Sequence, residues 1–234
     1  MEAASGRAPR AVLFDAYGTL FDVYSFGAAA ERLFPGAGER LVVLWRDKQI
    51  EYTRLTSMSG QARSFSDCTR AGLRYAARRF GLALDDAAER ELMGAYERLA
   101  PFPENRAVLV ELRRRGIRAG ILSNGDPAML EPVVRHAGFA ELLDPVLSVE
   151  STGRFKTDPA TYALGTQALG LAAAEIVFVS SNCWDAIGAT WFGYTTLWVN
   201  RFSLPLDELG AQPTRIGSQL TDVLDFFPFR GPSP

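Results

Sequence analysis

The feature that most limits how this chain can fold is a series of short apolar runs separated by segments with helical patterns. The five runs are residues 11–15, 117–122, 145–149, 176–180 and 195–199. Continuous apolar runs of this length are typical of strands buried on both faces of a sheet. Strands that alternate with helices predict a parallel sheet covered by helices on both faces. The sequence therefore predicts an α/β fold, in which ligands bind at the carboxyl ends of the strands.

Two of the intervening helices have recognisable ends. Asp126 and Asp158 are each followed by a proline, a pair that favours the N-cap and first turn of a helix. Gly138 and Gly170 follow at the far ends, where glycine commonly terminates a helix. We therefore expect each aspartate to cap the helix that it precedes.

One long interval interrupts the alternation of strand and helix. Residues 23–99 show helical periodicity and no convincing strand, and the interval is too long for an ordinary crossover. Three segments in it are predicted helices: residues 39–58, 65–80 and 85–99. We predict a helical cap domain of residues 23–99, inserted into a Rossmann-like core domain of residues 1–22 and 100–234.

Composition narrows the classes of partner. The chain is 47% hydrophobic and 22% charged, which is typical of a globular protein. Its formal net charge of -2 gives no reason to expect nucleic acid or a membrane surface as partner. Residues 1–10 are too short and polar for a signal peptide, and no apolar run approaches the roughly 20 residues that span a bilayer. We expect a cytoplasmic protein that acts on a small molecule.

Cysteine and histidine are scarce. The chain has two cysteines, Cys68 and Cys183, which lie far apart, and one histidine, His136. These residues offer little material for a zinc site or a histidine-based catalytic triad. We interpret all three as structural.

Polar residues follow four of the predicted strands. Asp15 ends the first strand, Ser123 and Asn124 follow the second, Lys156 follows the third, and Asp185 comes shortly after the fourth. A single aspartate at a strand end often does no more than cap a loop. Four strand ends that supply a candidate nucleophile, donors, a cation and a second acid are typical of an assembled active site.

With these motifs the chain resembles the haloacid dehalogenase superfamily, and within it the L-2-haloacid dehalogenases, from Ala11 to about Asp225. The resemblance includes the segment from Asp15 to Asp22 and Arg46 in the predicted cap. It implies a Rossmann-like core with a helical cap, a homodimer, and a reaction that needs no metal or organic cofactor. Residues 61–68 are more polar than the aromatic-rich stretch common in the family, so the resemblance does not imply a chain-length preference.

The reaction implied by the resemblance uses Asp15 as a nucleophile. Its carboxylate attacks C2 of a short L-2-haloalkanoate and expels halide, and water then hydrolyses the aspartyl ester at its carbonyl carbon. The product is the 2-hydroxyalkanoate with inverted configuration at C2, because only one displacement takes place at that carbon.

The resemblance also implies roles for residues around Asp15. Lys156 would hold Asp15 ionised, and Asp185 would position or activate the hydrolytic water. Alternatively, Lys156 and Asp185 form no more than an ion pair at the sheet edge. Three further residues would hold these groups in place: Thr19, Ser180 and Asn182.

Further residues are implied to contact the substrate and the halide. Ser123, with backbone N–H groups at the following helix start, would cradle the substrate carboxylate. Arg46 and Asn124 match the halide-accepting positions, although an arginine on a helix is more often solvated. The residues implied to surround the rest of the substrate are Tyr17, Ile50, Phe65, Tyr162 and Trp184. Aromatic residues such as Phe65 are also common as simple core packing.

Tyr17 separates this interpretation from its main alternative. Magnesium-dependent phosphatases of the superfamily usually carry a second aspartate two residues after the nucleophile, where it protonates the leaving alkoxide. A halide leaving group needs no proton, so Tyr17 at this position favours dehalogenation. A phosphatase and a catalytically silent binding protein that keeps the fold are the two alternatives.

Overall fold

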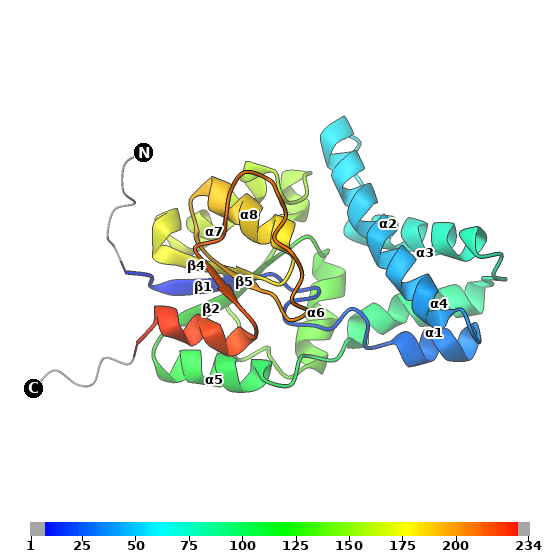
Figure 1. The fold of residues 1–234 in the computed structure, drawn as a ribbon, viewed down its shortest axis with the longest axis horizontal. Coiled ribbons are helices and arrows are strands. Elements are labelled where there is room, and N and C mark those ends of the chain that lie inside the picture. The colour runs from blue at the N-terminus through cyan, green and yellow to red at the C-terminus, as the bar shows by residue number, and fades with distance from the viewer. Residues whose placement is uncertain (1–7, 229–234) are drawn as a thin grey trace, which may run out of the picture.

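The computed structural model describes residues 8–228; residues 1–7, most of the segment considered above for a signal peptide, and 229–234 lie outside the described part. Its centre is a six-stranded parallel sheet with the strand order β3-β2-β1-β4-β5-β6 (Figure 1). The strands are β1 (Ala11–Phe14), β2 (Arg118–Ser123), β3 (Val146–Ser148), β4 (Ile176–Ser180), β5 (Thr195–Val199) and β6 (Arg215–Gly217). The five predicted strands are confirmed.

Strand β1 lies in the middle of the sheet, and its four residues are fully buried. Phe14 is paired with Ile121 of β2 on one side and with Val179 of β4 on the other. The chain leaves β1 toward β2 and β3 and returns to the other side at β4, so the strand order reverses next to β1. Ligands of open α/β sheets bind at such a reversal, at the carboxyl ends of the strands. Asp15 stands at this point.

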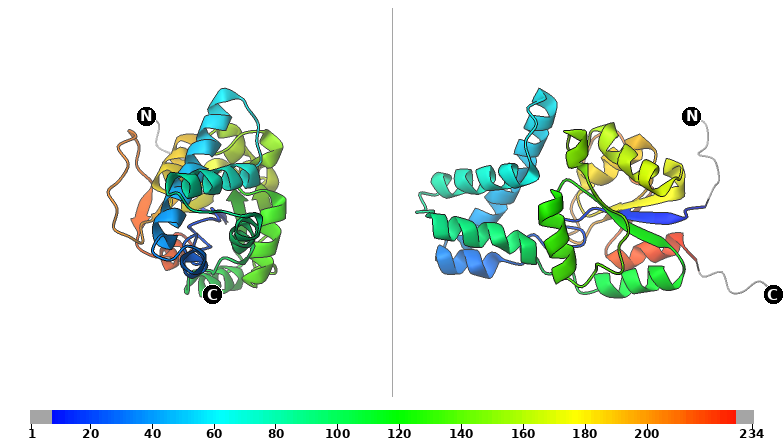
Figure 2. Two further views of the ribbon diagram at one scale, coloured as in Figure 1. Left: turned by 90° about the vertical axis from the view of Figure 1, so that its right-hand side faces the viewer. Right: turned by 180° about the vertical axis from the view of Figure 1, so that it is seen from behind.

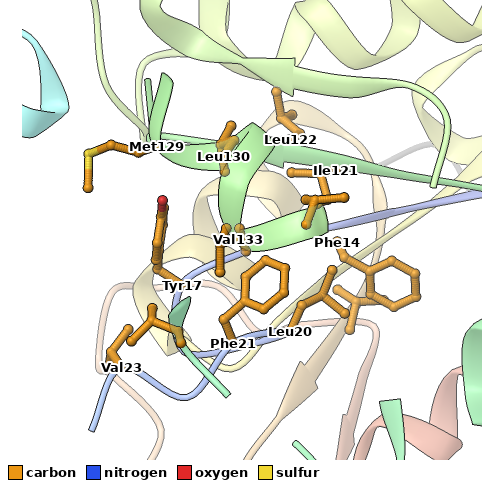
Figure 3. Packing of buried hydrophobic residues seen from close by; sticks show 14 of the residues in the cluster. Phe14, Tyr17, Leu20, Phe21, Val23, Ile121, Leu122, Met129, Leu130 and Val133 are labelled. Atoms are coloured by element: carbon orange, nitrogen blue, oxygen red, sulfur yellow. The ribbon is translucent and has the colours of Figure 1, made fainter. Parts of the chain in front are cut away.

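Helices cover both faces of the sheet. The main core helices are α5 (Asn105–Arg114), α6 (Pro127–His136), α7 (Pro159–Leu169) and α8 (Cys183–Phe192). In Figure 1, α7 and α8 lie above the sheet and α5 lies below it. Figure 3 shows the segment after β1, with Tyr17, Leu20 and Phe21, packed beside α6. The α/β fold is confirmed.

A group of helices lies beyond one end of the sheet, as Figure 1 and the right-hand view of Figure 2 show. It consists of α1 (Gly27–Leu33), α2 (Gly38–Ser59), α3 (Phe65–Arg79) and α4 (Asp86–Ala95). We refer to these four helices as the cap. All lie within residues 23–99, while the exact domain boundaries stay a prediction. No helix in residues 8–228 is both long and apolar enough to cross a membrane.

Asp126 stands at the N-cap position of α6, as predicted, with Pro127 in the first turn, but the expected side-chain cap is absent. Its side chain makes no capping hydrogen bond to α6. Both carboxylate oxygens instead accept hydrogen bonds from backbone N–H groups at the start of α3, in the cap. Asp158 does cap its own helix, because its Oδ1 accepts from the N–H of Ala160 at 2.9 Å. The aspartate of an Asp-Pro pair can therefore bind either the helix that it precedes or the start of another helix that lies within reach.

Candidate active site

The Asp15 side chain is held at the end of β1 by donors on both carboxylate oxygens. Lys156 Nζ lies 3.1 Å from Oδ1. Thr19 Oγ1 donates to Oδ2 at 3.1 Å, and Asn182 Nδ2 donates to the same oxygen at 2.9 Å. Asp15 is only 6% exposed. Its carboxylate is therefore ionically paired, fixed in orientation and largely removed from water, which is what a carboxylate nucleophile requires.

Two loops fix the donors that hold Asp15. Thr19 Oγ1 also accepts from the backbone N–H of Ser181 at 2.8 Å, which joins the loop after β1 to the loop after β4. Ser180 Oγ accepts from the N–H of Asn182 at 3.1 Å. Gly18, at a φ of 93°, makes the turn that brings Thr19 back to Asp15. Ser180 thus acts through Asn182, and not on Asp15 directly.

Lys156 joins the two acids of the site. Its Nζ lies 2.9 Å from Asp185 Oδ2 as well as against Asp15, and the side chain is almost completely buried. Burial by itself lowers the pKa of Lys156, but the two carboxylates raise it overall, so the ammonium group stays charged. Burial raises the pKa of Asp185, and the charge of Lys156 opposes this effect. Asp15, Lys156 and Asp185 thus form one group that includes the candidate nucleophile, and Lys156 and Asp185 are not an isolated ion pair.

Tyr162 holds Asp185. Its hydroxyl donates to Asp185 Oδ1 at 2.7 Å, and its ring packs against Phe178 and Tyr194 in the core. Its described contacts are with core residues and none is with the cap. Tyr162 therefore orients the second acid, and its contact with substrate stays a prediction.

Arg46 reaches the site from α2. It is 8% exposed, so a solvated helix face does not describe it. Nη2 donates to the carbonyl oxygen of Tyr17 at 3.1 Å, and Nη1 donates to Gln49 Oε1 at 2.6 Å. Gln49 in turn donates to Thr69 Oγ1 of α3 at 2.5 Å. The cap therefore places the buried guanidinium of Arg46 against the backbone of Tyr17, which follows Asp15 by two residues in the chain. Gln49 and Thr69 of α3 hold the guanidinium in this position.

Two stacked aromatic rings form a wall beside Asp15. Tyr17 and Phe65 are both buried, with ring centroids 5.3 Å apart. A Cβ on Gly125 would lie 2.6 Å from Tyr17 Cε2, so only glycine lets the ring pack so closely there. The Tyr17 hydroxyl is buried and has no hydrogen-bond partner among the described residues. Burial raises the pKa of Tyr17, so the hydroxyl remains protonated.

The loop after β2 retains free donors. Ser123 is buried, and its Oγ accepts from the N–H of Gly125 at 3.1 Å, which leaves the hydroxyl proton available. Asn124 Oδ1 accepts from the N–H of Lys156 at 3.0 Å, which leaves its amide N–H groups available. The start of α6 follows directly, so this edge of the site offers donors suited to an anion.

The last two predicted substrate residues lie on facing surfaces of cap and core. Ile50 is half-buried and lies one turn after Arg46 on α2. Trp184, at the start of α8, packs under the guanidinium of Arg54, with 4.7 Å between Arg54 Cζ and the ring centroid. Their contact with substrate stays a prediction.

Three residues that organise the site were not predicted to do so. Gln49 links Arg46 of α2 to Thr69 of α3, and Asp126 links the start of α6 to the start of α3. Asn105 is fully buried, and its Nδ2 donates to the carbonyl oxygens of Leu20 and Thr19 at 2.8 and 3.3 Å. A polar Gln49 between buried positions of α2 is a weak sequence signal, whereas nothing near Asn105 indicates its partners.

Carboxylates and backbone carbonyl oxygens are common ligands of metal ions, so the partners of these groups at the site show which of them are already bound. Asp15 and Asp185 share Lys156, and the carbonyl oxygen of Tyr17 accepts from both Arg46 and Asn182. In the described part of the chain, no three His, Cys, Asp or Glu side chains gather in a way that could hold a metal ion.

Comparisons with known proteins point to one family. A family model described as haloacid dehalogenase-like hydrolase matches residues 9–193. The (S)-2-haloacid dehalogenase of Pseudomonas sp. (strain YL) is 44% identical over 218 residues, which cover 93% of this chain and 94% of the relative.

Solved structures agree with this family. A crystal structure of an L-2-haloacid dehalogenase has a TM-score of 0.91 and 53% identity, and covers 94% of this chain and 99% of its own. The L-2-haloacid dehalogenase from Xanthobacter autotrophicus with chloropropionic acid covalently bound has a TM-score of 0.87 and 36% identity, with coverage of 92% and 96%. Sequence motifs, sheet topology and these similarities agree, and the chain belongs to the haloacid dehalogenase-like hydrolase family.

Proposed function

We propose that the protein is an (S)-2-haloacid dehalogenase, which converts short L-2-haloalkanoates to (R)-2-hydroxyalkanoates and halide. The observation that carries this proposal is the buried Asp15 carboxylate, held by Lys156 and two neutral donors, with Tyr17 where a phosphatase needs an acid. Relatives named (S)-2-haloacid dehalogenases, and one with chloropropionic acid covalently bound, support it.

In the first step, a carboxylate oxygen of Asp15 attacks C2 in line with the carbon–halogen bond. The new C–O bond forms as the halide leaves with the bonding electrons, so C2 is inverted once. A carboxylate is a weak nucleophile in water, and the dry, oriented position of Asp15 lowers the cost of its desolvation. Lys156 pairs with the Asp15 carboxylate and orients it before the attack.

In the second step, water attacks the Asp15 carbonyl carbon of the ester. Asp185 accepts the proton from this water, with Lys156 and Tyr162 fixing its two oxygens. The acyl C–O bond then breaks, and the leaving alkoxide takes the proton held by Asp185, which releases the hydroxyacid. The second proton of the water is lost to solvent as the Asp15 carboxylate is restored. The bond to C2 is untouched, so the inverted configuration persists in the product.

The two negative charges of the reaction have separate donors in the proposal. Ser123 and the N–H groups at the start of α6 hold the substrate carboxylate, because a helix N-terminus favours an anion. Arg46 and the free amide of Asn124 accept the departing halide, where charge develops in the transition state. Tyr17, Phe65, Ile50 and Trp184 surround the alkyl group.

A magnesium-dependent phosphatase is the less favoured alternative. Besides lacking an acid at position 17, the chain directs a guanidinium at the Tyr17 carbonyl oxygen, the group that supports the metal in those phosphatases. A cation already bound to this oxygen opposes a second one nearby. No described feature favours a catalytically silent binding protein.

The proposed reaction is tested by halide release from L-2-chloropropionate in EDTA, beside p-nitrophenyl phosphate with magnesium. We expect halide release in EDTA and no phosphatase activity, and loss of turnover in Asp15→Asn. A single turnover in water labelled with ¹⁸O should place the label in Asp15, because water attacks the ester at that carbonyl. Activity confined to the phosphate ester, or unlabelled Asp15 after turnover, would contradict the proposal.

Two further properties are proposed from the family resemblance and the sequence: a homodimer, and a cytoplasmic location. Light scattering coupled to gel filtration tests the first, and a mass of one chain at micromolar concentration would contradict it. Cell fractionation of the native host tests the second.

A further inference from the structure

The carboxylate of Asp126 connects the core to the cap. Oδ1 accepts from the N–H of Phe65 at 2.8 Å, and Oδ2 accepts from the N–H of Ser66 at 2.7 Å. The residue is 5% exposed, so water competes little for these bonds. A carboxylate at a helix N-terminus is favoured by the helix dipole, and hydrogen bonds to an ionised acceptor are strong. Asp126, a residue of the core domain, therefore anchors the start of α3 in the cap.

Helix α3 does not depend on Asp126 for its own N-cap. Ser64 precedes the helix, and its Oγ accepts from the N–H of Asp67 at 3.0 Å. This local cap already satisfies one of the free N–H groups at the helix start. The bonds from Asp126 add an attachment across the boundary between core and cap, in addition to the ordinary cap.

The attachment bears on the aromatic wall of the site. Phe65, one of the two residues that Asp126 binds, stacks on Tyr17 with an interplanar angle of 24°. Gly125, the neighbour of Asp126, lies against the Tyr17 ring at Cε2. The same short loop therefore contacts the Tyr17 ring through Gly125 and the backbone N–H of Phe65 through Asp126. The loop directly follows Ser123, the last residue of β2 and the proposed partner of the substrate carboxylate.

We infer that Asp126 is a positioning residue that sets substrate selectivity by holding Phe65 on Tyr17. The inference rests on the proposed function, in which this wall contacts the alkyl group of the substrate. Loss of the Asp126 carboxylate releases the start of α3, and Phe65 is then free to move away from Tyr17. A substrate with a methyl group on C2 loses packing contacts, whereas a haloacetate has only hydrogen there and loses almost none.

The test compares kcat/KM for L-2-chloropropionate and chloroacetate in Asp126→Ala. We expect the ratio of the two values to fall about tenfold, the size typical of one lost methyl contact in an apolar pocket. Asp126→Asn keeps an oxygen acceptor without the charge and should recover most of the ratio.

Asp85→Ala is the matched control. Asp85 caps α4, also in the cap, by accepting from the N–H of Ala88 at 2.8 Å, and it makes no described bond to the core. Both alanine variants lose an aspartate at a helix start, so both should unfold at a lower temperature. Only Asp126→Ala should change the substrate ratio and speed the exchange of the Phe65 and Ser66 amide hydrogens, measured by NMR without substrate.

The possible outcomes separate the two proposals. If the wild-type protein releases halide from neither haloacid, the proposed function fails and the selectivity role fails with it. If the wild type is active and Asp126→Ala lowers both kcat/KM values equally, or Asp85→Ala changes the ratio as much, Asp126 has only a structural role. Unchanged exchange of the two amides in Asp126→Ala would overturn the attachment itself.

Discussion

At the scale of single residues, the site is built around one buried cation between two carboxylates. Lys156 touches Asp15 and Asp185, and the aromatic ring of Phe178 lies 4.8 Å from its ammonium nitrogen. A buried ion group of this kind is costly to assemble, but removing one member leaves the others without compensation. Lys156 is therefore important for stability as well as for the proposed chemistry.

Lys156→Met should lower the free energy of unfolding by about 3–5 kcal/mol at pH 7, because two buried carboxylates lose their counter-ion. Burial opposes the charge of Lys156, yet the carboxylates raise its pKa in the folded state. Its contribution is thus complete below the ordinary lysine value of about 10.4 and is lost only as pH rises through the folded pKa. Urea unfolding at pH 7 and pH 9 should show equal deficits.

The control for this prediction is Lys48→Met. Lys48 pairs with the exposed Glu51 on α2 and lies 4.5 Å from the ring centroid of Tyr75, so the substitution should cost no more than about 1 kcal/mol. A deficit for Lys156→Met that shrinks between pH 7 and pH 9 would show that Lys156 loses its proton in that range.

Tyr17→Phe should not destabilise the free protein. The hydroxyl is buried without a described partner, and such a group costs about 1–3 kcal/mol when it is left unsatisfied. Removing it should keep or raise the midpoint of thermal unfolding, measured by calorimetry. A clear fall in the midpoint would mean that the hydroxyl has a partner in solution, such as an ordered water.

At the scale of elements, two connections align the loops with the strands. Asn105, the first residue of α5, donates to the carbonyl oxygens of Thr19 and Leu20 and so fixes the turn after β1. Trp198 of β5 donates to the carbonyl oxygen of Ser181 at 3.2 Å and fixes the turn after β4. The donors on Asp15 come from these two turns, so its geometry depends on α5 and β5 as well as on β1.

Asn105→Ala should lower both stability and activity. The carbonyl oxygens of Thr19 and Leu20 lose the Asn105 donor and keep only bonds of 3.4 Å, from Arg201 Nη2 and from the Phe102 N–H. The cost should be about 1 kcal/mol, and the turn that holds Thr19 loses its support. We expect kcat for L-2-chloropropionate to fall more than KM changes, since the orientation of Asp15 matters most during attack.

Arg113→Ala is the matched control on the same helix. Arg113, in the last turn of α5, donates to the carbonyl oxygen of Glu141 at 3.0 Å on the surface. Its kcat should equal that of the wild type. Equal losses of kcat in the two variants would argue against a link between Asn105 and Asp15.

At the scale of the whole molecule, the cap meets the core along α2 and at the start of α3. Arg46 binds the Tyr17 carbonyl, Arg54 covers Trp184, and Ser57 near the end of α2 accepts at its carbonyl from Arg154 Nη1 at 2.5 Å. Together with Asp126, these contacts hold the cap against the core at the end of the sheet where Asp15 lies. A cap held in this position keeps water away from the nucleophile.

Arg154→Ala should weaken the contact between cap and core. One hydrogen bond between cap and core is lost, and a loss of about 1 kcal/mol would raise KM for L-2-chloropropionate about fivefold. The control is Arg106→Ala, because Arg106 makes the same kind of bond within the core, to the carbonyl oxygen of Gly138 at 2.9 Å. Steady-state kinetics should show a raised KM only for the Arg154 variant, and the same KM in both would contradict the prediction.

Much of this protein is determined by local sequence. The apolar runs and the polar residues after them predict the sheet and the convergence of Asp15, Lys156 and Asp185, because the carboxyl ends of parallel strands lie at one edge. The predicted helices 39–58 and 65–80 differ by a residue or so from Gly38–Ser59 and Phe65–Arg79, since helical periodicity is a local signal. Strand β6 was missed because its three residues, Arg215–Gly217, do not lie in an apolar run, unlike those of the equally short edge strand β3.

Tertiary structure alone decided which side chains meet across the boundary between core and cap. The sequence pattern of Asp126 indicates a cap for α6, but the start of α3 lies within reach and takes its carboxylate. Tyr162, predicted only as a substrate contact, also donates to Asp185 and so orients the second acid. Partners of this kind depend on how distant segments pack, and periodicity or local propensity carries no information about that.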